Sequence, residues 1–373
     1  MTEKTFYRDS WANIHLNHIA FNIQQLKQRL SPDTNIYAVV KANAYGHGDI
    51  EVAKTALEAG APRLAVAILD EAIRLRDAGI TVPILVMGWI RPEDVWIAAE
   101  RDITVTFFQK QWLEQVKKMD FSKPLTLHMK WDTGMGRIGI REEAELIEVL
   151  HNLNDDRFKL EGIFTHFATA DEAEIAYYKE QQTRFNQLFA CFQAHWTKPV
   201  ILHTGNSAAS MRFPEEMKHF VRFGISMYGL YPSKVAKAEE PIKLKPAMSL
   251  HSRLIHVKKV PAQTAISYGA TYKTDKEEWI GTVPLGYADG IIRKLQGMDV
   301  LVNGQRMPIV GRVCMDQFMV KLDQSYPIGT LVTIIGSQSG NAIEMDEIAD
   351  YLDTISYEVA CTISARVPRL YRE

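Results

Sequence analysis

The 373-residue chain has few cysteines, almost no net charge and no long apolar run. Its three cysteines, Cys191, Cys314 and Cys361, lie far apart and form neither a zinc-binding spacing nor a disulfide framework, which favours a reducing cytoplasm. The 43 basic and 45 acidic side chains leave a formal charge of −2, which argues against a general nucleic-acid binder. No run approaches the ~18 apolar residues of a membrane span, and the N-terminus lacks the apolar stretch of a secretory signal. These absences exclude membrane, fibrous and disulfide-stapled classes and predict a cytoplasmic globular protein.

In the first two thirds of the chain, an apolar run, a polar loop and an amphipathic stretch alternate. The apolar runs contain few polar residues, which fits strands of a parallel sheet that are buried on both faces. Between them, apolar residues recur at spacings of three and four, which predicts helices at His18–Leu30, Glu142–Leu150 and Ala176–Trp196. The predicted strands are Ile36–Val40, Leu64–Ile68, Ile84–Met87, Thr104–Phe107, Leu125–Met129, Gly162–Thr165, Val200–Leu202 and Phe220–Phe223.

Eight such units predict an α/β fold, a (β/α)₈ TIM-type barrel, although an open doubly wound sheet shows the same alternation. In either fold, chemistry is expected directly after the strand ends. The pattern changes near Tyr231–Pro246, and beyond it short runs and turns predict a mainly β domain with a hairpin at Asn303-Gly304. We therefore expect a barrel over residues 1–240 and a C-terminal β domain over residues 241–373. For the first ten or so residues, packing on the C-terminal domain is left open.

Lys41 directly follows the first predicted strand, within the segment VVKANAYGHG. A lysine at the mouth of a barrel is desolvated, which lowers the pKa of its amine and makes it nucleophilic, as a Schiff base requires. The alternative is a lysine that reaches solvent at the barrel rim. In the same segment, Tyr45 either borders a phosphate or packs against its neighbours.

The segment VVKANAYGHG resembles the cofactor-lysine motif of alanine racemases, barrel-type enzymes that use pyridoxal 5′-phosphate (PLP). The resemblance implies a barrel, a C-terminal β domain and a homodimer whose active sites draw on both subunits. It also implies a PLP-dependent racemase, an isomerase that interconverts L-alanine and D-alanine and supplies D-alanine for peptidoglycan precursors. Other segments resemble family motifs in family order, between Lys41 and Arg369: DTGMGRIG, THFATADE, HTGNSAAS, VRFGISMYGLYP, ISYGATY, GYADG, VGRVCMDQF and ISYEVACTISARVPR.

A racemase removes the α-proton from one face of an amino acid and returns a proton to the other face, for which two bases are the simplest solution. The resemblance assigns one base to Lys41, modified as the PLP Schiff base, and the other to Tyr268 of the partner subunit. It places Arg222 at the pyridine nitrogen, which a guanidinium would not protonate. It assigns the other cofactor contacts to His166, Tyr45, Asn206, Ser207, Gly224, Ile225 and Tyr357. Four of these follow the seventh and eighth predicted strands, where barrels often bind phosphate.

The substrate carboxylate needs a cation or an N–H group, and the resemblance assigns it to Arg137 and to the backbone at Met315-Asp316 of the other subunit. Lys130 matches a lysine that family members often carry as a carbamate, an anion that would orient Arg137. Tyr287 resembles a residue of the channel through which the substrate enters. Tyr357 crowds the substrate side chain in the family, which predicts a preference for alanine.

The segment Gly134–Gly139 also satisfies G-x-G-x-x-G, follows a predicted strand and precedes a predicted helix, as a dinucleotide site requires. Glu161 lies about 20 residues further on, where a ribose-binding acid is expected. An NAD-dependent oxidoreductase is therefore an alternative, although it gives no role to Lys41, Arg222 and Tyr268. A non-catalytic PLP-carrying protein and a PLP-dependent decarboxylase are further alternatives. We expect no metal site, because no third ligand accompanies the paired histidines near the N-terminus.

Overall fold

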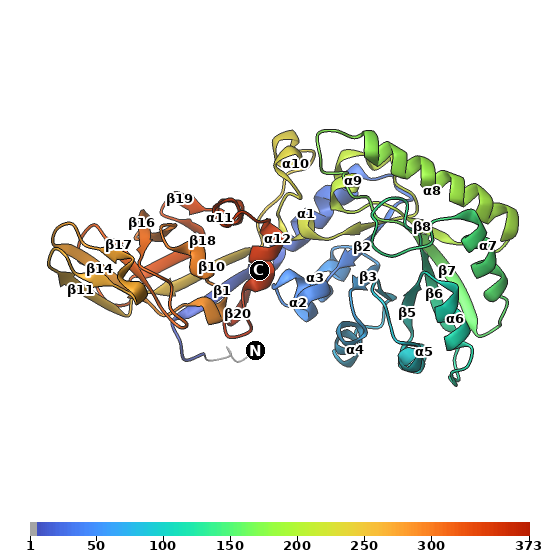
Figure 1. The fold of residues 1–373 in the computed structure, drawn as a ribbon, viewed down its shortest axis with the longest axis horizontal. Coiled ribbons are helices and arrows are strands. Elements are labelled where there is room, and N and C mark those ends of the chain that lie inside the picture. Colours follow the sequence, from blue (N-terminus) through green and yellow to red (C-terminus); the bar gives the residue numbers. More distant parts are fainter. Residues whose placement is uncertain (1–5) are drawn as a thin grey trace. The chain divides into compact units, whose positions relative to one another are not determined.

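The computed structural model describes residues 6–373, so the first five residues of the predicted N-terminal domain lie outside it. The chain forms two compact units, each visible in Figure 1. The barrel unit comprises residues 18–44 and 49–245. The β unit comprises the described residues up to 17, the short segment 45–48, and residues 246–373. Among residues 6–373, no helix is long and apolar enough to cross a membrane.

The barrel unit contains one parallel eight-stranded sheet in the order β8-β7-β6-β5-β4-β3-β2-β9. Strand β9 returns to pair with β2, so that Tyr37 on β2 lies opposite Arg63 on β3 and Arg222 on β9. Between β8 and β9, the Arg222 N–H donates to the Gly205 carbonyl at 2.9 Å, which nearly closes the ring. The predicted barrel is confirmed. An open doubly wound sheet is excluded, because its strand order would reverse at a switch point.

Each predicted barrel strand forms, with small shifts at its ends. The largest shift is in β7, which begins at Phe158 because its first residues alternate between buried and exposed and so lack a continuous apolar run. The strands are β2 (Asn35–Val39), β3 (Arg63–Val66), β4 (Ile84–Val86), β5 (Ile103–Phe107), β6 (Leu125–Lys130), β7 (Phe158–Phe164), β8 (Ile201–His203) and β9 (Phe220–Phe223).

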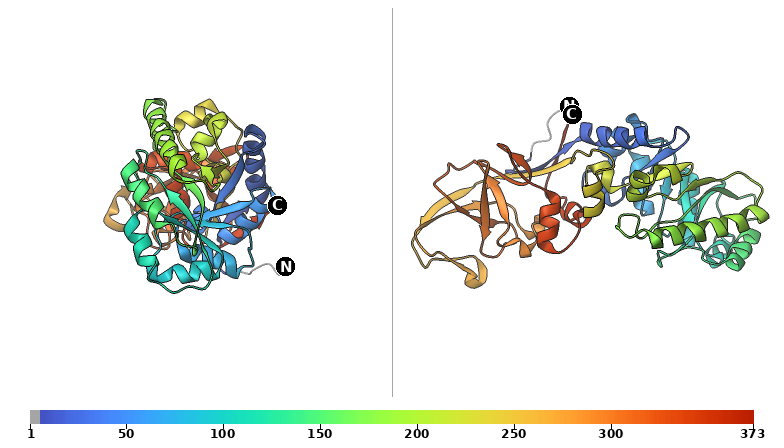
Figure 2. Two further views of the ribbon diagram at one scale, coloured as in Figure 1. Left: turned by 90° about the vertical axis from the view of Figure 1, so that its right-hand side faces the viewer. Right: turned by 90° about the horizontal axis from the view of Figure 1, so that it is seen from above.

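Helices surround the barrel strands, as the left view of Figure 2 shows. The three helices predicted from apolar spacing form as α1, α7 and α8, and α1 buries Ile19, Ile23 and Leu26 on one face. The helices of this unit are α1 (Leu16–Arg29), α2 (Lys41–Tyr45), α3 (Asp49–Glu58), α4 (Leu69–Asp77), α5 (Val95–Glu100), α6 (Lys110–Val116), α7 (Glu143–Asn152), α8 (Ala176–His195), α9 (Ser207–Arg212) and α10 (Lys234–Glu239). Helix α1 begins in the β unit, at Leu16, and helix α2 ends in it, at Tyr45.

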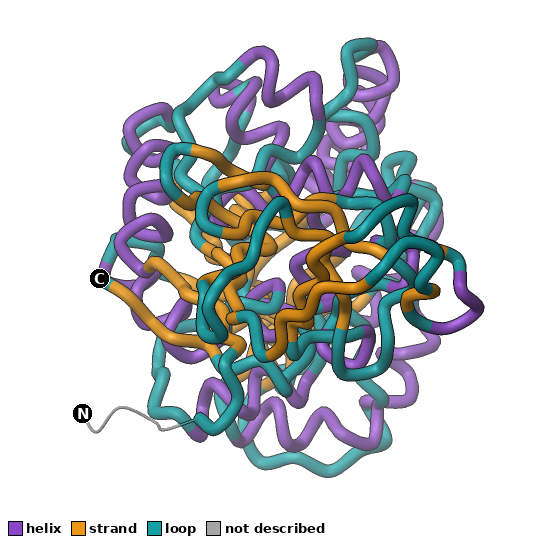
Figure 3. Tube along the Cα trace, turned by 90° about the vertical axis from the view of Figure 1, so that its left-hand side faces the viewer, coloured by secondary structure: helices purple, strands orange, loops and turns teal. Residues whose placement is uncertain are grey.

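The β unit consists mainly of strands and loops, seen in Figure 3. Strand β1 pairs antiparallel with β10 and parallel with β20, which joins the two ends of the chain in one sheet. The predicted hairpin at Asn303-Gly304 is confirmed, since both residues have positive φ between β15 and β16. The elements are β1 (Ser10–His15), β10 (Met248–Arg253), β11 (His256–Val260), β12 (Ala265–Ile266), β13 (Tyr272–Lys273), β14 (Glu278–Val283), β15 (Asp299–Val302), β16 (Gln305–Val310), β17 (Phe318–Leu322), β18 (Leu331–Gln338), β19 (Asn341–Ile343), α11 (Met345–Leu352), α12 (Ser356–Thr362) and β20 (Arg369–Arg372).

The glycine-rich segment Gly134–Gly139 does not open a helix, because it lies inside the loop between β6 and α7. Asp132 Oδ1 accepts from the N–H groups of Gly134 and Gly136 at 3.1 and 3.0 Å, so a carboxylate occupies the side that a pyrophosphate would need. Glu161 bonds to other barrel side chains and is not free to bind a ribose. The dinucleotide-binding alternative is therefore wrong.

Candidate active site

The carboxyl ends of the barrel strands carry nine of the site residues predicted from the sequence. Because parallel strands end at the same face of a barrel, these residues share one end of the barrel unit. They are Lys41 after β2, Lys130 at the end of β6, Arg137 in the following loop, His166 after β7, Asn206 and Ser207 after β8, Arg222 within β9, and Gly224 and Ile225 after β9.

Lys41 begins a turn in which the next four residues all have left-handed backbone angles, with φ between 50° and 53° from Ala42 to Tyr45. Left-handed helix costs roughly 1–2 kcal/mol per non-glycine residue, so neighbouring groups must stabilise it. The Glu71 carboxylate accepts from the Ala42 N–H at 2.6 Å, and Asn43 Oδ1 accepts from the Asp49 N–H at 3.2 Å. The backbone behind Lys41 is therefore held in place. Sequence analysis missed Glu71, which no motif distinguishes from other helix glutamates.

Four basic side chains act on His166. Burial lowers the pKa of its imidazole well below the usual value, and the charges of Arg222, Lys130, Arg137 and Lys41 lower it further. A neutral imidazole thus lies in a strongly positive environment. Such an environment attracts anions, because a low local dielectric strengthens each electrostatic interaction.

Lys130 is buried, and its Nζ has no hydrogen-bond partner among the described residues. Burial lowers the pKa of its amine to about 7, and the Arg222 and Arg137 charges act in the same direction, while Asp132 opposes them. The Nζ atom lies 5.4 Å from the centre of the Phe164 ring. A large fraction of this amine is therefore neutral and nucleophilic at neutral pH.

Arg222 is buried, and its acceptors among residues 6–373 are all neutral. Its Nη1 donates to His203 Nδ1 at 3.0 Å and to the His203 carbonyl at 2.5 Å. Its Nη2 donates to the carbonyls of Thr165 and Thr204 at 2.7 and 3.1 Å and lies 3.4 Å from His166 Nδ1. Burial lowers the pKa of the guanidinium to about 9, so it remains a cation at neutral pH. The described residues supply no partner for its Nε–H.

The loops after β8 and β9 are tied together at the same end of the barrel. Ser207 Oγ accepts from the Gly224 N–H at 2.9 Å, and Ile225 begins a short 3₁₀ helix, Ile225–Tyr228. Asn206 caps α9, since its Oδ1 accepts from the Ala209 N–H at 3.0 Å. The side chain of Asn206 thus fixes the start of α9 at this end of the barrel.

The other predicted residues lie in the β unit. Tyr45 and Tyr357 are brought together there, with ring centres 6.1 Å apart. Tyr45 is buried, which raises the pKa of its phenol above the usual value. Gly46 has φ of 81° and approaches the Ala360 carbonyl so closely that a Cβ would lie 2.3 Å from its oxygen. A glycine is required at this point because both the backbone angle and the contact exclude a side chain.

The remaining predicted residues lie on three segments of the β unit, and the loop between β16 and β17, residues 311–317, contacts the other two. The hydroxyl of Ser267, beside Tyr268, donates to the Arg312 carbonyl, and the Tyr287 N–H donates to the Cys314 carbonyl at 3.0 Å. Tyr268 is 68% exposed in the single chain. The group brought together is Tyr268, Tyr287, Met315 and Asp316.

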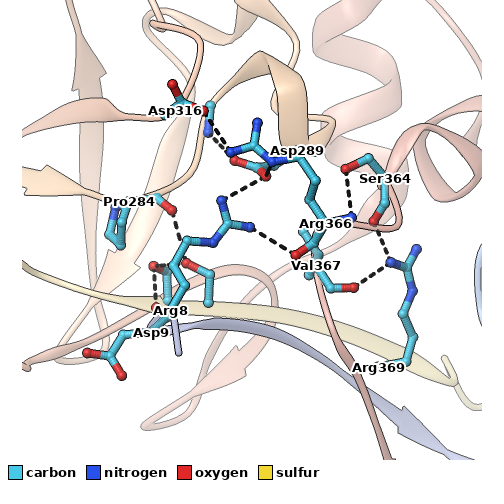
Figure 4. A network of polar contacts seen from close by, with 12 residues as sticks. Arg8, Asp9, Pro284, Asp289, Asp316, Ser364, Arg366, Val367 and Arg369 are labelled. Atoms are coloured by element: carbon cyan, nitrogen blue, oxygen red, sulfur yellow. Dashed lines mark hydrogen bonds and ion pairs between the residues drawn. The ribbon is translucent and has the colours of Figure 1, made fainter. Parts of the chain in front are cut away.

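Beside Tyr287, a buried carboxylate joins two arginines, as Figure 4 shows. Asp289 Oδ1 lies 2.8 Å from Arg8 Nη1 and 3.4 Å from Arg366 Nε, and Arg366 Nη2 donates to Asp316 Oδ1 at 2.7 Å. Asp289 Oδ2 accepts from the Gly286 N–H at 3.0 Å. This network fixes the turn that carries Tyr287. Sequence analysis missed Asp289 and Arg8, although Asp289 lies in the GYADG segment quoted for the resemblance.

Comparison with known proteins identifies the family. The family model described as "Alanine racemase, N-terminal domain" matches residues 14–232, and the one described as "Alanine racemase, C-terminal domain" matches residues 247–371. Alanine racemase from Anoxybacillus flavithermus is 52% identical over 99% of this chain and 96% of its own length. Alanine racemase 1 from Bacillus subtilis is 52% identical over 100% of this chain and 95% of its own.

Solved structures agree with these relatives. The crystal structure of alanine racemase from Bacillus anthracis with bound L-Ala-P is 50% identical and superposes with a TM-score of 0.97, covering 99% of this chain and 96% of the other. Both the sequence and the fold therefore match along nearly the whole length. The chain belongs to the alanine racemase family and is an isomerase, an amino-acid racemase.

Proposed function

We propose that this chain interconverts L-alanine and D-alanine with pyridoxal 5′-phosphate as its cofactor, and that Lys41 and Tyr268 of the partner subunit are the two bases. The observation that carries the proposal is the group of basic side chains around a neutral His166. PLP brings a phosphate and the amino acid brings a carboxylate, and both are anions that this environment favours. The relatives at 52% identity are named alanine racemases, which supports alanine as the substrate.

The donor set of the barrel unit suits PLP. Lys41 offers a primary amine, and Arg222 offers a guanidinium that stays protonated at neutral pH and would donate to the ring nitrogen of the cofactor. The Ser207 hydroxyl, which accepts from the Gly224 N–H and keeps its own hydrogen to donate, and the Ile225 N–H would supply donors for a phosphate, and Asn206 caps the helix beside them. The resemblance assigns two further hydroxyl donors, Tyr45 and Tyr357, whose ring centres lie 6.1 Å apart within the β unit. When bound, the cofactor supplies a conjugated ring system that accepts the negative charge left at the substrate α-carbon.

The two bases act on opposite faces of the α-carbon. Lys41 Nζ takes the α-proton on one face or returns it there, and the phenol oxygen of Tyr268 of the partner subunit does so on the other. Because Arg222 holds its proton, it would donate a hydrogen bond to the bound cofactor without delivering a proton to it, which would disfavour side reactions at the substrate α-carbon.

The substrate carboxylate is held by Arg137, with backbone N–H groups at Met315-Asp316 of the partner subunit. Lys130 becomes an anion when carbamylated and then orients Arg137. Its neutral amine, buried without a hydrogen-bond partner among the described residues, supports this assignment. Tyr357 limits the side-chain pocket to a small group, and Tyr287 lines the approach to it.

The wider context follows from the same proposal. We propose a homodimer with shared active sites, because Tyr268 is largely exposed in the single chain and has a role only beside Lys41 of another. The domain boundary at 240/241 and the cytoplasmic location also remain proposals. D-alanine would serve as a peptidoglycan precursor.

Exchange of the α-proton tests the function. PLP-loaded protein is incubated in D₂O with each alanine enantiomer, and NMR follows loss of the α-proton while a chiral assay follows inversion. Both enantiomers are expected to exchange and to invert. If neither does so, the proposed function is wrong.

The matched control for this assay is a pair of lysine substitutions. Lys41→Ala is expected to abolish exchange, whereas Lys54→Ala is expected to leave it unchanged, because Lys54 lies exposed on α3 in an ion pair with Glu51. Release of carbon dioxide without inversion would instead indicate a decarboxylase. Binding of PLP with no exchange would indicate a non-catalytic carrier.

A further inference from the structure

A continuous chain of hydrogen bonds runs through the barrel interior from Arg222 to a carboxylate. Arg222 Nη1 lies 3.0 Å from His203 Nδ1, and His203 Nε2 lies 2.8 Å from His128 Nδ1. His128 Nε2 lies 3.1 Å from Glu161 Oε2. Both histidines are fully buried. The chain thus crosses from β9 through β8 and β6 to β7.

The direction of each hydrogen bond is set by the two ends of this chain. A guanidinium only donates, so His203 Nδ1 must accept and His203 Nε2 must carry the hydrogen. His203 Nε2 then donates to His128 Nδ1, which leaves the hydrogen of His128 on Nε2, where the Glu161 carboxylate accepts it. Protonating either histidine would set two donors against each other. Burial lowers the pKa of both imidazoles, which agrees with two neutral rings.

Arg63 holds Glu161 in its acceptor form. Its Nη1 donates to Glu161 Oε2 at 2.7 Å and to the Tyr37 hydroxyl at 3.2 Å. Burial alone would raise the pKa of the Glu161 carboxyl, but the hydrogen bonds from His128 and Arg63 lower it to about 2. An ionised carboxylate is therefore present throughout the neutral range.

A second, independent feature shows that the barrel makes room for this chain. Gly162, next to Glu161 on β7, faces the His128 ring, and a Cβ at this position would lie 2.5 Å from the nearest ring atom. No positive φ requires a glycine here. The absence of a side chain at residue 162 therefore serves the position of the His128 imidazole.

We propose that Glu161 is a positioning residue that fixes the tautomers of His128 and His203 and thereby holds the Arg222 guanidinium in one orientation. Both terminal nitrogens, Nη1 and Nη2, are then engaged, and the Nε–H has no partner among the described residues. That this N–H faces the cofactor ring rests on the proposed function. The assignment of the tautomers does not rest on the proposed function, because it follows from contacts within the chain. The sequence had suggested a ribose-binding role for Glu161, and its contacts assign it this role instead.

NMR of the full chain labelled with ¹⁵N-histidine tests the tautomers without cofactor or substrate. Signals are assigned with His128→Gln and His203→Gln. In the native chain at neutral pH, both histidines are expected to be neutral and to carry hydrogen on Nε2. Hydrogen on Nδ1 of either ring, or double protonation of either, overturns the proposal. This spectrum of the native chain does not depend on whether a Glu161 variant folds.

Glu161→Gln provides the functional arm. A carboxamide can present its N–H group to His128 Nε2, so a second population with hydrogen on Nδ1 is expected for both histidines. The signal of His251, which bonds to Thr333 and Ser249 in the β unit, should stay unchanged and serves as the internal control. In the loaded enzyme, kcat is expected to fall on the order of tenfold with little change in KM, as for other outer groups that orient a ligand.

Two further results separate the possible failures. Glu161→Asp keeps a carboxylate and should retain the native tautomers, whereas unchanged tautomers in Glu161→Gln would overturn the proposal. Native tautomers in a chain that racemises no amino acid would leave the positioning role standing and refute the proposed function. Racemase activity in a chain with the wrong tautomers would refute the positioning role and leave the proposed function standing.

Discussion

The Ala42 N–H donates to Glu71 Oε1 at 2.6 Å, so one carboxylate on α4 holds the start of the left-handed turn behind Lys41. The other oxygen, Oε2, accepts from the N–H groups of Ala67 and Ile68 at 2.8 and 3.3 Å. Glu71 thereby joins the end of β2 to the loop between β3 and α4. A strained segment at a functional site persists only when such contacts outweigh its cost.

Glu71→Ala is therefore expected to destabilise the chain by about 1–3 kcal/mol, because it leaves buried N–H groups without an acceptor. Urea unfolding of the full chain measures this loss. The control is Glu58→Ala on α3, whose exposed side chain should change stability by less than about 0.5 kcal/mol. Equal losses in the two variants would show that the turn does not depend on Glu71.

Mixing two inactive variants tests whether the active sites are shared between subunits. Lys41→Ala and Tyr268→Phe are each expected to be inactive as homodimers. In a mixed dimer, one site loses both bases and the other keeps both, so unfolding and refolding the variants together should restore about a quarter of the native rate. Recovery is measured by chiral assay at equal concentrations. If each chain formed a complete site by itself, mixing would restore nothing.

Lys130 should make stability depend on pH. In the folded chain the pKa of its amine is about 7, against 10.5 in the reference state. Between these values the unfolded chain binds more protons at this side chain, so the free energy of unfolding rises with pH, by at most ~1.36 kcal/mol per pH unit. Below about pH 7 the Lys130 amine is protonated in both the folded and the unfolded chain, so its contribution to the free energy of unfolding no longer changes with pH.

The comparison for this effect is Lys130→Met, which keeps the bulk and loses the titrating group. Urea unfolding in buffer free of carbon dioxide should show a smaller rise in stability between about pH 7 and pH 10 for the variant than for the native chain. Identical pH profiles would show that the Lys130 amine is not perturbed. Added bicarbonate should flatten the native profile, because a carbamylated amine no longer titrates as a lysine.

Asp289 is expected to stabilise the turn that carries Tyr287. Asp289→Ala removes the acceptor of the Gly286 N–H and the partner of Arg8 and Arg366, which should cost about 1–3 kcal/mol. The two arginines reach solvent, so the loss is smaller than for a fully buried ion pair. Thermal unfolding of the full chain measures it, with the exposed Asp9→Ala as the control. A loss no larger than that of the control would rule out a role for the network.

The barrel could be predicted from the sequence because its strands are short-range features. A buried parallel strand appears in the sequence as a continuous apolar run. An outer helix appears as apolar residues spaced three and four apart. Both patterns can be recognised within a short segment of the sequence. The same holds for Asn303-Gly304, whose backbone preference is local. The glycine-rich segment Gly134–Gly139 shows the limit of such patterns, because only the structure reveals that a loop carboxylate, and no helix, receives its N–H groups.

The sequence alone placed Lys41 directly after a predicted strand, and family motifs marked Arg222 and Tyr268. Both inferences need only the order of residues along the chain. Only the tertiary structure decided that Glu71 contacts Ala42 and that Glu161 reaches Arg222 through two histidines. These partners lie far apart in the chain and share no local pattern. They meet because closing the barrel brings β6, β7, β8 and β9 around one interior, where buried polar groups must find partners among whatever residues the closure supplies.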